Sequence, residues 1–376
     1  MQDIKDKKVA IVADWLTSRG GAERVVLAMT ELFPNADIFT SVYKPEAFPE
    51  LKDRNVKTSF LQKWPLGKKH QLWPTLRPLA FEMLDLDNYD IVISSASAEA
   101  KGVITKPETL HICYCHTPTR YYWSEYHNYL KHPEFGFLNP IVKFVMPRLI
   151  HRARLWDKLA ADRVDYFIAN SQNTKKRIKK YYERDAKVLL PPVEAERFSV
   201  SEEIGDYYLI LGRQTSYKRT DVAIDAFNKL GLPLKVIGVG PTLEKSKSIA
   251  KENINFLGKA SDTEVTKHLA NAKALIFPQE EDAGIVPMEA MASGRPVIAY
   301  GKGGALETVI DKETGLFFRE QTGDSLALAI QEFEKMTWDS KKIKDHVDQF
   351  STTNFKRNLY DIINDAYAKH EDSNKI

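Results

Sequence analysis

Cysteine is nearly absent from this chain. Its 376 residues include two cysteines, Cys113 and Cys115, which are separated by a single residue. Two neighbouring thiols cannot form a disulfide framework, and alone they do not complete a zinc site. Because both lie in an apolar run that we predict to be a strand, we expect them to be buried and reduced.

Long apolar runs and an excess of one charge are also lacking. No 18 consecutive residues are apolar, and the first eight residues do not resemble the apolar region of a signal peptide. The 54 basic residues face 51 acidic ones, so the net charge of +3 gives no general attraction to nucleic acid. The composition predicts a cytosolic globular protein that meets a membrane only through its surface.

The length of the chain predicts two domains, because 376 residues are many for one hydrophobic core. Apolar runs that are typical of buried parallel strands recur in both halves of the sequence. The segment Leu190–Phe198 breaks both the strand and the helix periodicity. We therefore predict the interdomain linker in this segment.

The most informative segment lies between two apolar runs, Ala274–Phe277 and Pro296–Ala299. We predict that these runs are parallel strands joined by a short helix. Pro287 suits the first helical turn and Gly294 suits the end of the helix, which is therefore expected from about Val286 to Ser293.

Two carboxylates, Glu281 and Glu289, are expected before this helix and in its first turn. Gly284 lets a backbone approach a ligand closely, and the amides of Gly284, Ile285 and Val286 would point toward an anion. Sugars and ribose offer hydroxyl donors in pairs, so two carboxylates in an otherwise apolar segment can accept from them. Alternatively, the carboxylates only stabilise the helix N-terminus. The spacing alone does not decide between these interpretations.

The same segment resembles the E-x7-E signature of the retaining nucleotide-sugar glycosyltransferases of family 4. The residues that carry the resemblance are Glu281, Gly284, Pro287, Glu289, Ala290 and Gly294, followed by Pro296-Val-Ile. The family usually has an aromatic residue before the glycine, whereas this chain has Ala283. The resemblance implies the GT-B architecture, an α/β fold class with two doubly wound, Rossmann-like parallel-sheet domains facing a cleft.

The resemblance also implies that the two domains bind different substrates. Residues 1–190 are expected to form the acceptor-binding domain, and residues 198–354 are expected to bind the nucleotide sugar. The C-terminal helix, about residues 355–376, is expected to pack back on the first domain.

Gly20 and Gly21 stand between a predicted strand, Lys8–Asp14, and a predicted helix, Ala22–Phe33. Such strand-to-helix turns offer backbone amides to phosphates or sugars. The dinucleotide pattern G-x-G-x-x-G is absent, and a plain tight turn is the alternative. Because the turn resembles the Gly-Gly-x-Glu loop of the same family, we predict that both glycines bind the donor.

His116 ends a predicted strand that begins at His111, and it lies at the carboxyl end of the strand, where open α/β sheets bind ligands. A single histidine is more often structural. The surrounding Cys-His-Thr-Pro-x-Arg-Tyr, however, resembles a loop of bacterial O-antigen-type mannosyltransferases of family 4, whose histidine reaches the donor sugar. The resemblance implies a catalytic role for His116 and makes Arg120, Tyr121 and Tyr122 candidate acceptor contacts.

Two cations follow a predicted strand in the second half of the chain. Arg213 comes directly after the run Tyr207–Leu211, and Lys218 precedes a predicted helix, Asp221–Leu230. Arginine can grip two phosphate oxygens, and lysine adds a movable point charge, so the pair suits a diphosphate. Surface cations on a loop are the alternative. The arrangement resembles the Gly-Arg…Lys phosphate motif of the family.

Further predicted strands end in glycine loops, as in Leu234–Pro241, Ile254–Gly258 and the later segment Gly301–Glu307. We expect these loops to surround the nucleotide base. The predicted donor-binding residues are Gly20, Gly21, Gly238, Gly240, Gly258, Ala283, Gly284, Ile285, Val286 and Glu289.

The resemblance implies transfer of a hexose, mannose from GDP-mannose, to a polyprenyl-diphosphate-linked glycan of a surface polysaccharide. The predicted catalytic residues are His116, Arg213, Lys218 and Glu281. No cofactor and no metal are expected, because the cations and helix amides would stabilise the leaving diphosphate and no Asp-x-Asp motif lies near them. Two alternatives remain open: a UDP- or dTDP-linked donor, and a non-catalytic partner protein that binds sugar nucleotides.

Basic residues are interleaved with apolar ones in the first half of the chain. They are Lys68 and Lys69 near Trp64 and Trp73, then Lys143, Arg148, Arg152 and Arg154, and finally the run Lys175–Lys180. Such mixtures are found at core edges and on solvated faces, but also on surfaces that dock on anionic lipid. We predict a cytoplasmic protein, peripheral at the inner face of the plasma membrane.

Overall fold

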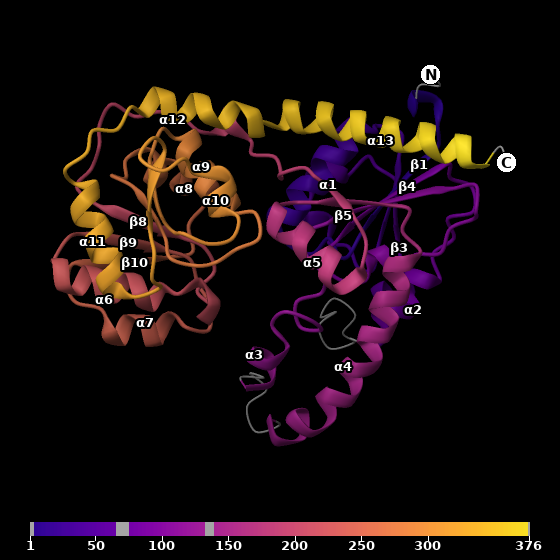
Figure 1. Cartoon of the computed structure of the whole chain (residues 1–376), viewed down its shortest axis with the longest axis horizontal. Coiled ribbons are helices and arrows are strands. Elements are labelled where there is room, and N and C mark those ends of the chain that lie inside the picture. Colours follow the sequence, from indigo (N-terminus) through magenta and orange to yellow (C-terminus); the bar gives the residue numbers. More distant parts are fainter. Residues whose placement is uncertain (1–3, 65–74, 132–138, 375–376) are drawn as a thin grey trace. The chain divides into compact units, whose positions relative to one another are not determined.

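The computed structural model describes residues 4–64, 75–131 and 139–374 (Figure 1). The chain forms two compact units: unit 1 comprises Met1–Leu190 and Lys356–Ile376, and unit 2 comprises Pro191–Phe355. Most of the segment predicted as a linker belongs to unit 2. There Val193 is fully buried and pairs with Ser351 in an isolated parallel bridge.

Unit 1 is built on a seven-stranded parallel sheet with the order β3-β2-β1-β4-β5-β6-β7. Its strands are β1 Val9–Ala13, β2 Asp37–Thr40, β3 Val56–Thr58, β4 Ile91–Ala96, β5 Leu110–Cys115, β6 Tyr166–Ala169 and β7 Ala186–Val188. The longer helices of the unit are α1 Gly21–Leu32, α2 Arg77–Glu82, α3 Tyr126–Lys131, α4 Asn139–Asp162 and α5 Gln172–Tyr182. The strand order reverses between β1 and β4, as in a doubly wound sheet.

Unit 2 repeats this plan with six parallel strands in the order β10-β9-β8-β11-β12-β13. They are β8 Tyr208–Leu211, β9 Leu234–Ile237, β10 Ile254–Gly258, β11 Leu275–Phe277, β12 Val297–Tyr300 and β13 Gly315–Phe318. The helices are α6 Thr220–Leu230, α7 Leu243–Ile249, α8 Asp262–Ala270, α9 Ile285–Ala292, α10 Ala305–Thr308, α11 Gly323–Phe333 and α12 Ser340–Val347. Here the order reverses between β8 and β11.

The burial of the central strands explains why the sequence contains continuous apolar runs. Every residue of β4 and β5 is buried, because helices cover both faces of a parallel sheet. Cys113 and Cys115 lie in this core and are unpaired, which confirms their predicted state. In unit 2 the rings of Tyr208 and Phe227 lie 5.2 Å apart in the corresponding core.

The predicted fold class, two doubly wound parallel-sheet domains, is confirmed. The sequence also predicts strands at Ile38–Val42 and Ile91–Ser95, which correspond to β2 and β4. Every strand predicted from the sequence is present, but four short ones were not predicted: β3, β6, β7 and β13. Each has three or four residues, and three of them are edge strands, so they carry too little apolar periodicity to stand out.

The sequence also predicts an interruption of helix α4 at Pro147, because proline removes a backbone donor. That prediction is wrong, since α4 runs without a break through Pro147. The last helix, α13 Thr352–Asn374, contacts unit 1 through the ion pairs Lys356–Glu31 at 2.9 Å and Lys187–Asp365 at 3.4 Å. In the part of the chain that the structure describes, no helix has the length and apolar character needed to span a bilayer.

Candidate active site

The reversal point of the unit 2 sheet gathers the predicted phosphate and sugar residues. Open α/β sheets bind ligands outside the carboxyl ends of their strands at such a point. The loop after β8 carries Arg213 and Lys218, and the loop after β11 carries Glu281. Lys218 Nζ donates a hydrogen bond to Glu281 Oε1, and the two side chains form an ion pair that is 13% and 16% exposed. The structure thus brings together a cation that we predicted to bind phosphate and a carboxylate that we predicted to bind the sugar.

Arg213 is exposed and forms no ion pair with any residue that the structure describes. The loop that carries Arg213 is held in place by the side chain of Gln214, which is 1% exposed. The Gln214 side chain donates to Gly212 O at 2.9 Å, and its Oε1 accepts from Thr220 Oγ1 at 2.9 Å. This glutamine could not be recognised from the sequence, because its partners are backbone and hydroxyl groups that any polar residue could contact.

Gly238 and Gly240 have a structural role, and their predicted contact with the donor stays a prediction. A Cβ atom on Gly238 would stand 1.9 Å from Gly212 O, and one on Gly240 would stand 2.1 Å from Gln214 O. The close approach that these glycines permit is therefore made by the protein's own phosphate loop. Of the three glycines predicted near the nucleotide base, Gly258 alone has open space, with no atom within 4 Å of the position of a Cβ atom.

Helix α9 begins within one residue of the predicted start. Its N-cap, Gly284, has φ +63° and ψ +63°, a left-handed conformation that side chains disfavour. The ring of Phe277 lies 3.7 Å from the position of a Cβ on Gly284. An aromatic ring therefore flanks this glycine even though the preceding residue, Ala283, is small. Ile285 and Val286 form the first turn of the helix and are half-buried.

Glu289 lies just beyond the first turn of α9, and not within it as predicted, because the helix starts one residue earlier, at Ile285. The residue is 5% exposed. Its predicted contact with a ribose stays a prediction. Any such contact would involve the small part of Glu289 that remains accessible.

The loop after β12 holds the backbone of Glu281 in place. Gly304 N donates to Glu281 O at 2.7 Å, and a Cβ on Gly303 would stand 2.4 Å from the same oxygen. The sequence indicated this loop only as one more glycine-rich connection. Its position against Glu281 follows from the pairing of β11 with β12.

The reversal point of unit 1 is occupied by a residue that the sequence analysis missed. Asp14 directly follows β1, and its carboxylate accepts hydrogen bonds from three amides of the loop after β4: Ser97 at 2.6 Å, Ala98 at 2.9 Å and Ala100 at 2.8 Å. Burial, together with repulsion from Glu99, raises the pKa of the Asp14 carboxyl to about 6. An acidic residue directly after an apolar strand was the available signal.

Gly20 is the N-cap of α1, and Gly21 is its first residue. A Cβ on Gly20 would stand 2.8 Å from Glu23 Oε2, so the side chain of Glu23 lies against this turn. Burial raises the pKa of Glu23 to about 7, partly opposed by the backbone amides of Glu23 and Gly20. The turn where we predicted donor contacts thus already holds a carboxyl group.

His116 directly follows β5 and is 9% exposed. Its Nε2 lies 2.8 Å from Ser95 Oγ, and its ring packs edge-on against Tyr114 at 5.1 Å. Its backbone N–H donates to Ala96 O at 2.9 Å. The ring is therefore oriented by the neighbouring strand β4.

The predicted acceptor residues surround a buried carboxylate, Glu99, which is 0% exposed. Its Oε1 accepts from the hydroxyls of Tyr121 and Tyr122 at 3.1 Å each and pairs with Arg77 at 3.1 Å. Because Tyr122 is buried and its hydroxyl is used inside the protein, the geometry argues against its direct contact with an acceptor. Arg120, next to these tyrosines, is half-exposed.

Two protein-family models match the chain. The model described as Glycosyltransferase Family 4 matches residues 19–197, and the model described as Glycosyl transferases group 1 matches residues 192–349. The first match ends close to the boundary between the two units.

Several curated proteins are similar in sequence. An uncharacterized glycosyltransferase of Methanocaldococcus jannaschii is 30% identical over 48% of this chain and 53% of its own length. The alpha-1,3/1,6-mannosyltransferase ALG2 of Kluyveromyces lactis is 24% identical over 98% of this chain and 84% of its own length. A GDP-mannose-dependent alpha-(1-6)-phosphatidylinositol monomannoside mannosyltransferase of Mycobacterium tuberculosis is 32% identical over 32% of this chain and 36% of its own length. The chain thus spans about half the length of the first of these relatives.

Solved structures with the same fold cover almost the whole chain. A sucrose-phosphate synthase from Thermosynechococcus elongatus matches 96% of this chain and all of its own with a TM-score of 0.70 at 15% identity. Anabaena HepE in complex with UDP matches 95% of this chain and all of its own with a TM-score of 0.68 at 14% identity. At these identities the likeness concerns the fold.

Proposed function

The chain belongs to family 4 of the glycosyltransferases and has the GT-B type of fold, and on that premise we propose that it transfers mannose from GDP-mannose. The proposed acceptor is a polyprenyl-diphosphate-linked glycan of a surface polysaccharide. The observation that carries the proposal is the meeting of Lys218 and Glu281 at the reversal point of unit 2.

The choice of mannose rests on two relatives, whose names give a mannosyl transfer and, for the mycobacterial enzyme, GDP-mannose as the donor. The complex of HepE with UDP supports a nucleotide-linked donor in general. A UDP- or dTDP-linked sugar is therefore the alternative donor.

In the proposed reaction, Arg213 and Lys218 stabilise the diphosphate as it leaves the sugar. The amides at the N-terminus of α9, from Gly284 to Val286, face the same group as a positive helix end. Lys218 then exchanges the carboxylate of Glu281 for the diphosphate. Glu281, freed from this pair, accepts hydrogen bonds from the hydroxyls of the sugar.

The transfer proceeds with retention, by attack of the acceptor hydroxyl on the same face through an oxocarbenium-like state. His116 contacts the donor sugar, and the position of its ring is set by Ser95. The positive charge on the phosphate side is supplied by side chains and helix amides, so the proposed mechanism uses no metal ion and no cofactor.

We place the enzyme at the cytoplasmic face of the plasma membrane, held through unit 1. The outer side of α4 exposes Phe144, Leu155 and Leu159, which are 68%, 58% and 60% accessible, and Arg148 and Arg152 are exposed beside them. Apolar side chains flanked by arginines suit an anionic lipid surface.

The other predicted membrane contacts are only partly described. Lys176, Lys179 and Lys180 are exposed on α5, whose N-terminus is capped by Ser171. Lys68, Lys69 and Trp73 lie outside the described residues, as does the side chain of Lys143.

Release of nucleotide tests the proposal. The purified chain is incubated with a membrane extract of the source organism and, in parallel, with GDP-mannose, UDP-glucose or dTDP-glucose. We expect GDP release from GDP-mannose that depends on the extract, because the acceptor resides there. Release from a UDP- or dTDP-sugar instead would replace the donor, and absence of release from all three would contradict the proposed function.

A further inference from the structure

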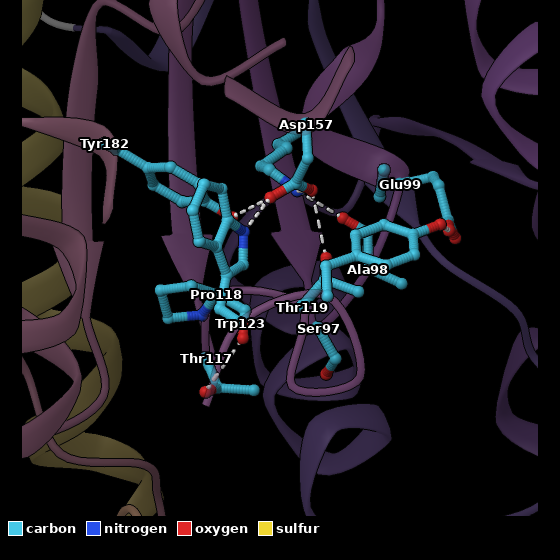
Figure 2. A network of polar contacts seen from close by, with 12 residues as sticks. Ser97, Ala98, Glu99, Thr117, Pro118, Thr119, Trp123, Asp157 and Tyr182 are labelled. Carbon is cyan, nitrogen blue, oxygen red and sulfur yellow. Dashed lines mark hydrogen bonds and ion pairs between the residues drawn. The ribbon is translucent and has the colours of Figure 1, made fainter. Parts of the chain in front are cut away.

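Asp157, on α4, is fully buried and accepts four side-chain hydrogen bonds (Figure 2). Lys101 Nζ and Thr119 Oγ1 donate to its Oδ1 at 2.6 and 3.0 Å. Trp123 Nε1 and Tyr182 OH donate to its Oδ2, both at 2.7 Å. Figure 2 shows these donors converging on the single carboxylate from separate parts of unit 1.

Three of the four donors come from the two loops that form the carboxyl edge of the sheet next to His116. Lys101 lies in the short helix Ala100–Gly102 after β4 and also donates to Ala98 O at 2.6 Å. Thr119 and Trp123 lie in the loop 117–123, which follows His116 directly. Tyr182 comes from α5 and belongs to neither loop.

A buried carboxylate needs compensation for the loss of water, and Lys101 already neutralises its charge. Burial alone would lower the pKa of Lys101, but the attraction and hydrogen bond of Asp157 raise it above its ordinary value. Charge neutrality therefore does not require Thr119 or Trp123. Their bonds to Asp157 do something else: they fix the first and the last part of the loop 117–123.

The middle of the same loop is fixed by the second buried carboxylate, Glu99, through Tyr121 and Tyr122. Between these anchors lies Arg120, which stays half-exposed at the edge of the sheet. The start of the loop is held by α5, because Thr174 Oγ1 donates to His116 O at 3.2 Å.

We propose that Asp157 is a positioning residue, which sets the loop 117–123 and thereby the places of His116 and Arg120 in the transfer reaction. This inference rests on the proposed function for the part that concerns turnover. Asp157 itself lies behind the loop, in the core, and touches neither the donor nor the acceptor.

The test removes the loop's bonds and keeps the buried ion pair. Asp157→Asn would leave Lys101 uncompensated and endanger folding. We therefore change residues of the loop: Thr119→Val and Trp123→Phe, singly and together, delete the two donors. Thr119→Val keeps the side-chain volume, whereas Trp123→Phe also shortens a ring that stacks on Tyr181 at 5.0 Å. Tyr182→Phe is the matched control, because it deletes a bond of the same length to the same carboxylate without freeing the loop.

Two measurements are made on the wild type and all variants. Hydrogen–deuterium exchange is followed in peptides that cover residues 117–123, and GDP release from GDP-mannose is followed with the membrane extract. We expect the double loop variant to exchange faster in these peptides and to lose about 10- to 100-fold in kcat, the scale of a misplaced reacting group. Its KM for GDP-mannose should stay within about twofold, since the proposed donor phosphate residues lie in unit 2.

Tyr182→Phe should lower the melting temperature about as much as either single loop variant, with wild-type exchange in residues 117–123 and wild-type kcat. The proposal is overturned if the double variant exchanges like the wild type. It is equally overturned if exchange rises while kcat holds, or if Tyr182→Phe lowers kcat as much as the loop variants do. A wild type without GDP release contradicts the proposed function instead, and the exchange measurement alone then decides whether Asp157 orders the loop.

Discussion

Lys218 and Glu281 form an ion pair across the reversal point of the unit 2 sheet, although the chain separates them by 63 residues. Each of them has a proposed partner in the donor, so the pair must open when the donor binds. We expect Lys218→Ala to lower kcat/KM by about 100-fold or more, because it removes charge that stabilises the leaving group. Glu281→Ala should lower it by about 10- to 100-fold, the worth of one hydrogen bond to a charged group.

The melting temperature separates this role from a structural one. Because these side chains are only 13% and 16% exposed, removal of one partner should cost up to about 3 kcal/mol, and either variant should stay folded and melt within about 12 °C of the wild type. Lys229→Ala is the matched control, since it breaks an ion pair with Asp324 on the same unit at 2.6 Å. It should leave turnover unchanged. If Glu281→Ala unfolds the protein or retains full turnover, Glu281 does not bind the sugar.

Transfer should persist in excess EDTA. The reason is that Arg213, Lys218 and the start of α9 supply positive charge where a divalent ion would otherwise act. GDP release from GDP-mannose is measured with the membrane extract after EDTA treatment of both components, and again after addition of Mg²⁺ or Mn²⁺. Activity that disappears with the chelator and returns with either ion would refute the assignment of the phosphate site.

The buried carboxyl of Asp14 should make the stability of the protein depend on pH. Burial, with Glu99 nearby, raises its folded-state pKa to about 6, above its ordinary value of about 3.9. The folded state therefore holds more protons than the unfolded state between these values, and stability falls as the pH rises through this window. The loss from this group amounts to about 2 kcal/mol between pH 4 and pH 7.

Asp14→Asn isolates this contribution. The difference in apparent unfolding free energy between wild type and variant, measured with urea at pH 4 and pH 7, should shift by about 2 kcal/mol against the wild type at the higher pH. Asp53→Asn is the control, because this carboxylate is largely exposed and should give the same difference at both values. An equal difference for Asp14→Asn at pH 4 and pH 7 would show that its carboxyl titrates normally.

The sequence predicted those site residues whose signal is local. Lys218 and Glu281 each stand in a loop directly after an apolar strand, and in parallel sheets such loops share one edge. Asp14, Glu99 and Asp157 were missed because their partners lie far along the chain. The amides that Asp14 binds, for example, are more than 80 residues away.

Glycine shows a second limit of prediction from sequence. A glycine after a strand indicates that something approaches the backbone closely, but not what approaches. At Gly238 and Gly240 the neighbour is the loop of Arg213, so packing inside the protein is already a sufficient reason for glycine at both positions. At Gly284 the positive φ angle, which the start of α9 requires, is itself sufficient reason for glycine.

The last prediction concerns the membrane. Helix α4 exposes Leu155 and Leu159, and α5 exposes lysines, so both should contact an anionic bilayer if unit 1 docks on it. Each basic residue near such a surface contributes on the order of 1 kcal/mol, and the contribution weakens with salt. The wild type should pellet with anionic vesicles at low salt, but not with neutral ones.

Two variants and their controls decide the prediction. Lys175, Lys176, Lys179 and Lys180 are changed to Glu; Arg177 is kept, because it also bonds to Thr117. The control changes four exposed lysines of unit 2 to Glu, namely Lys245, Lys247, Lys341 and Lys342, and thus alters the net charge equally.

In the same way, Leu155→Ser with Leu159→Ser is compared with Leu328→Ser, which removes a leucine exposed on α11. Pelleting should fall for the α4 and α5 variants and hold for the controls. Equal losses in the lysine variant and its control would mean that only the net charge matters. Equal losses in the two leucine variants would mean that the leucines of α4 have no special role. A wild type that stays in solution would favour a soluble acceptor.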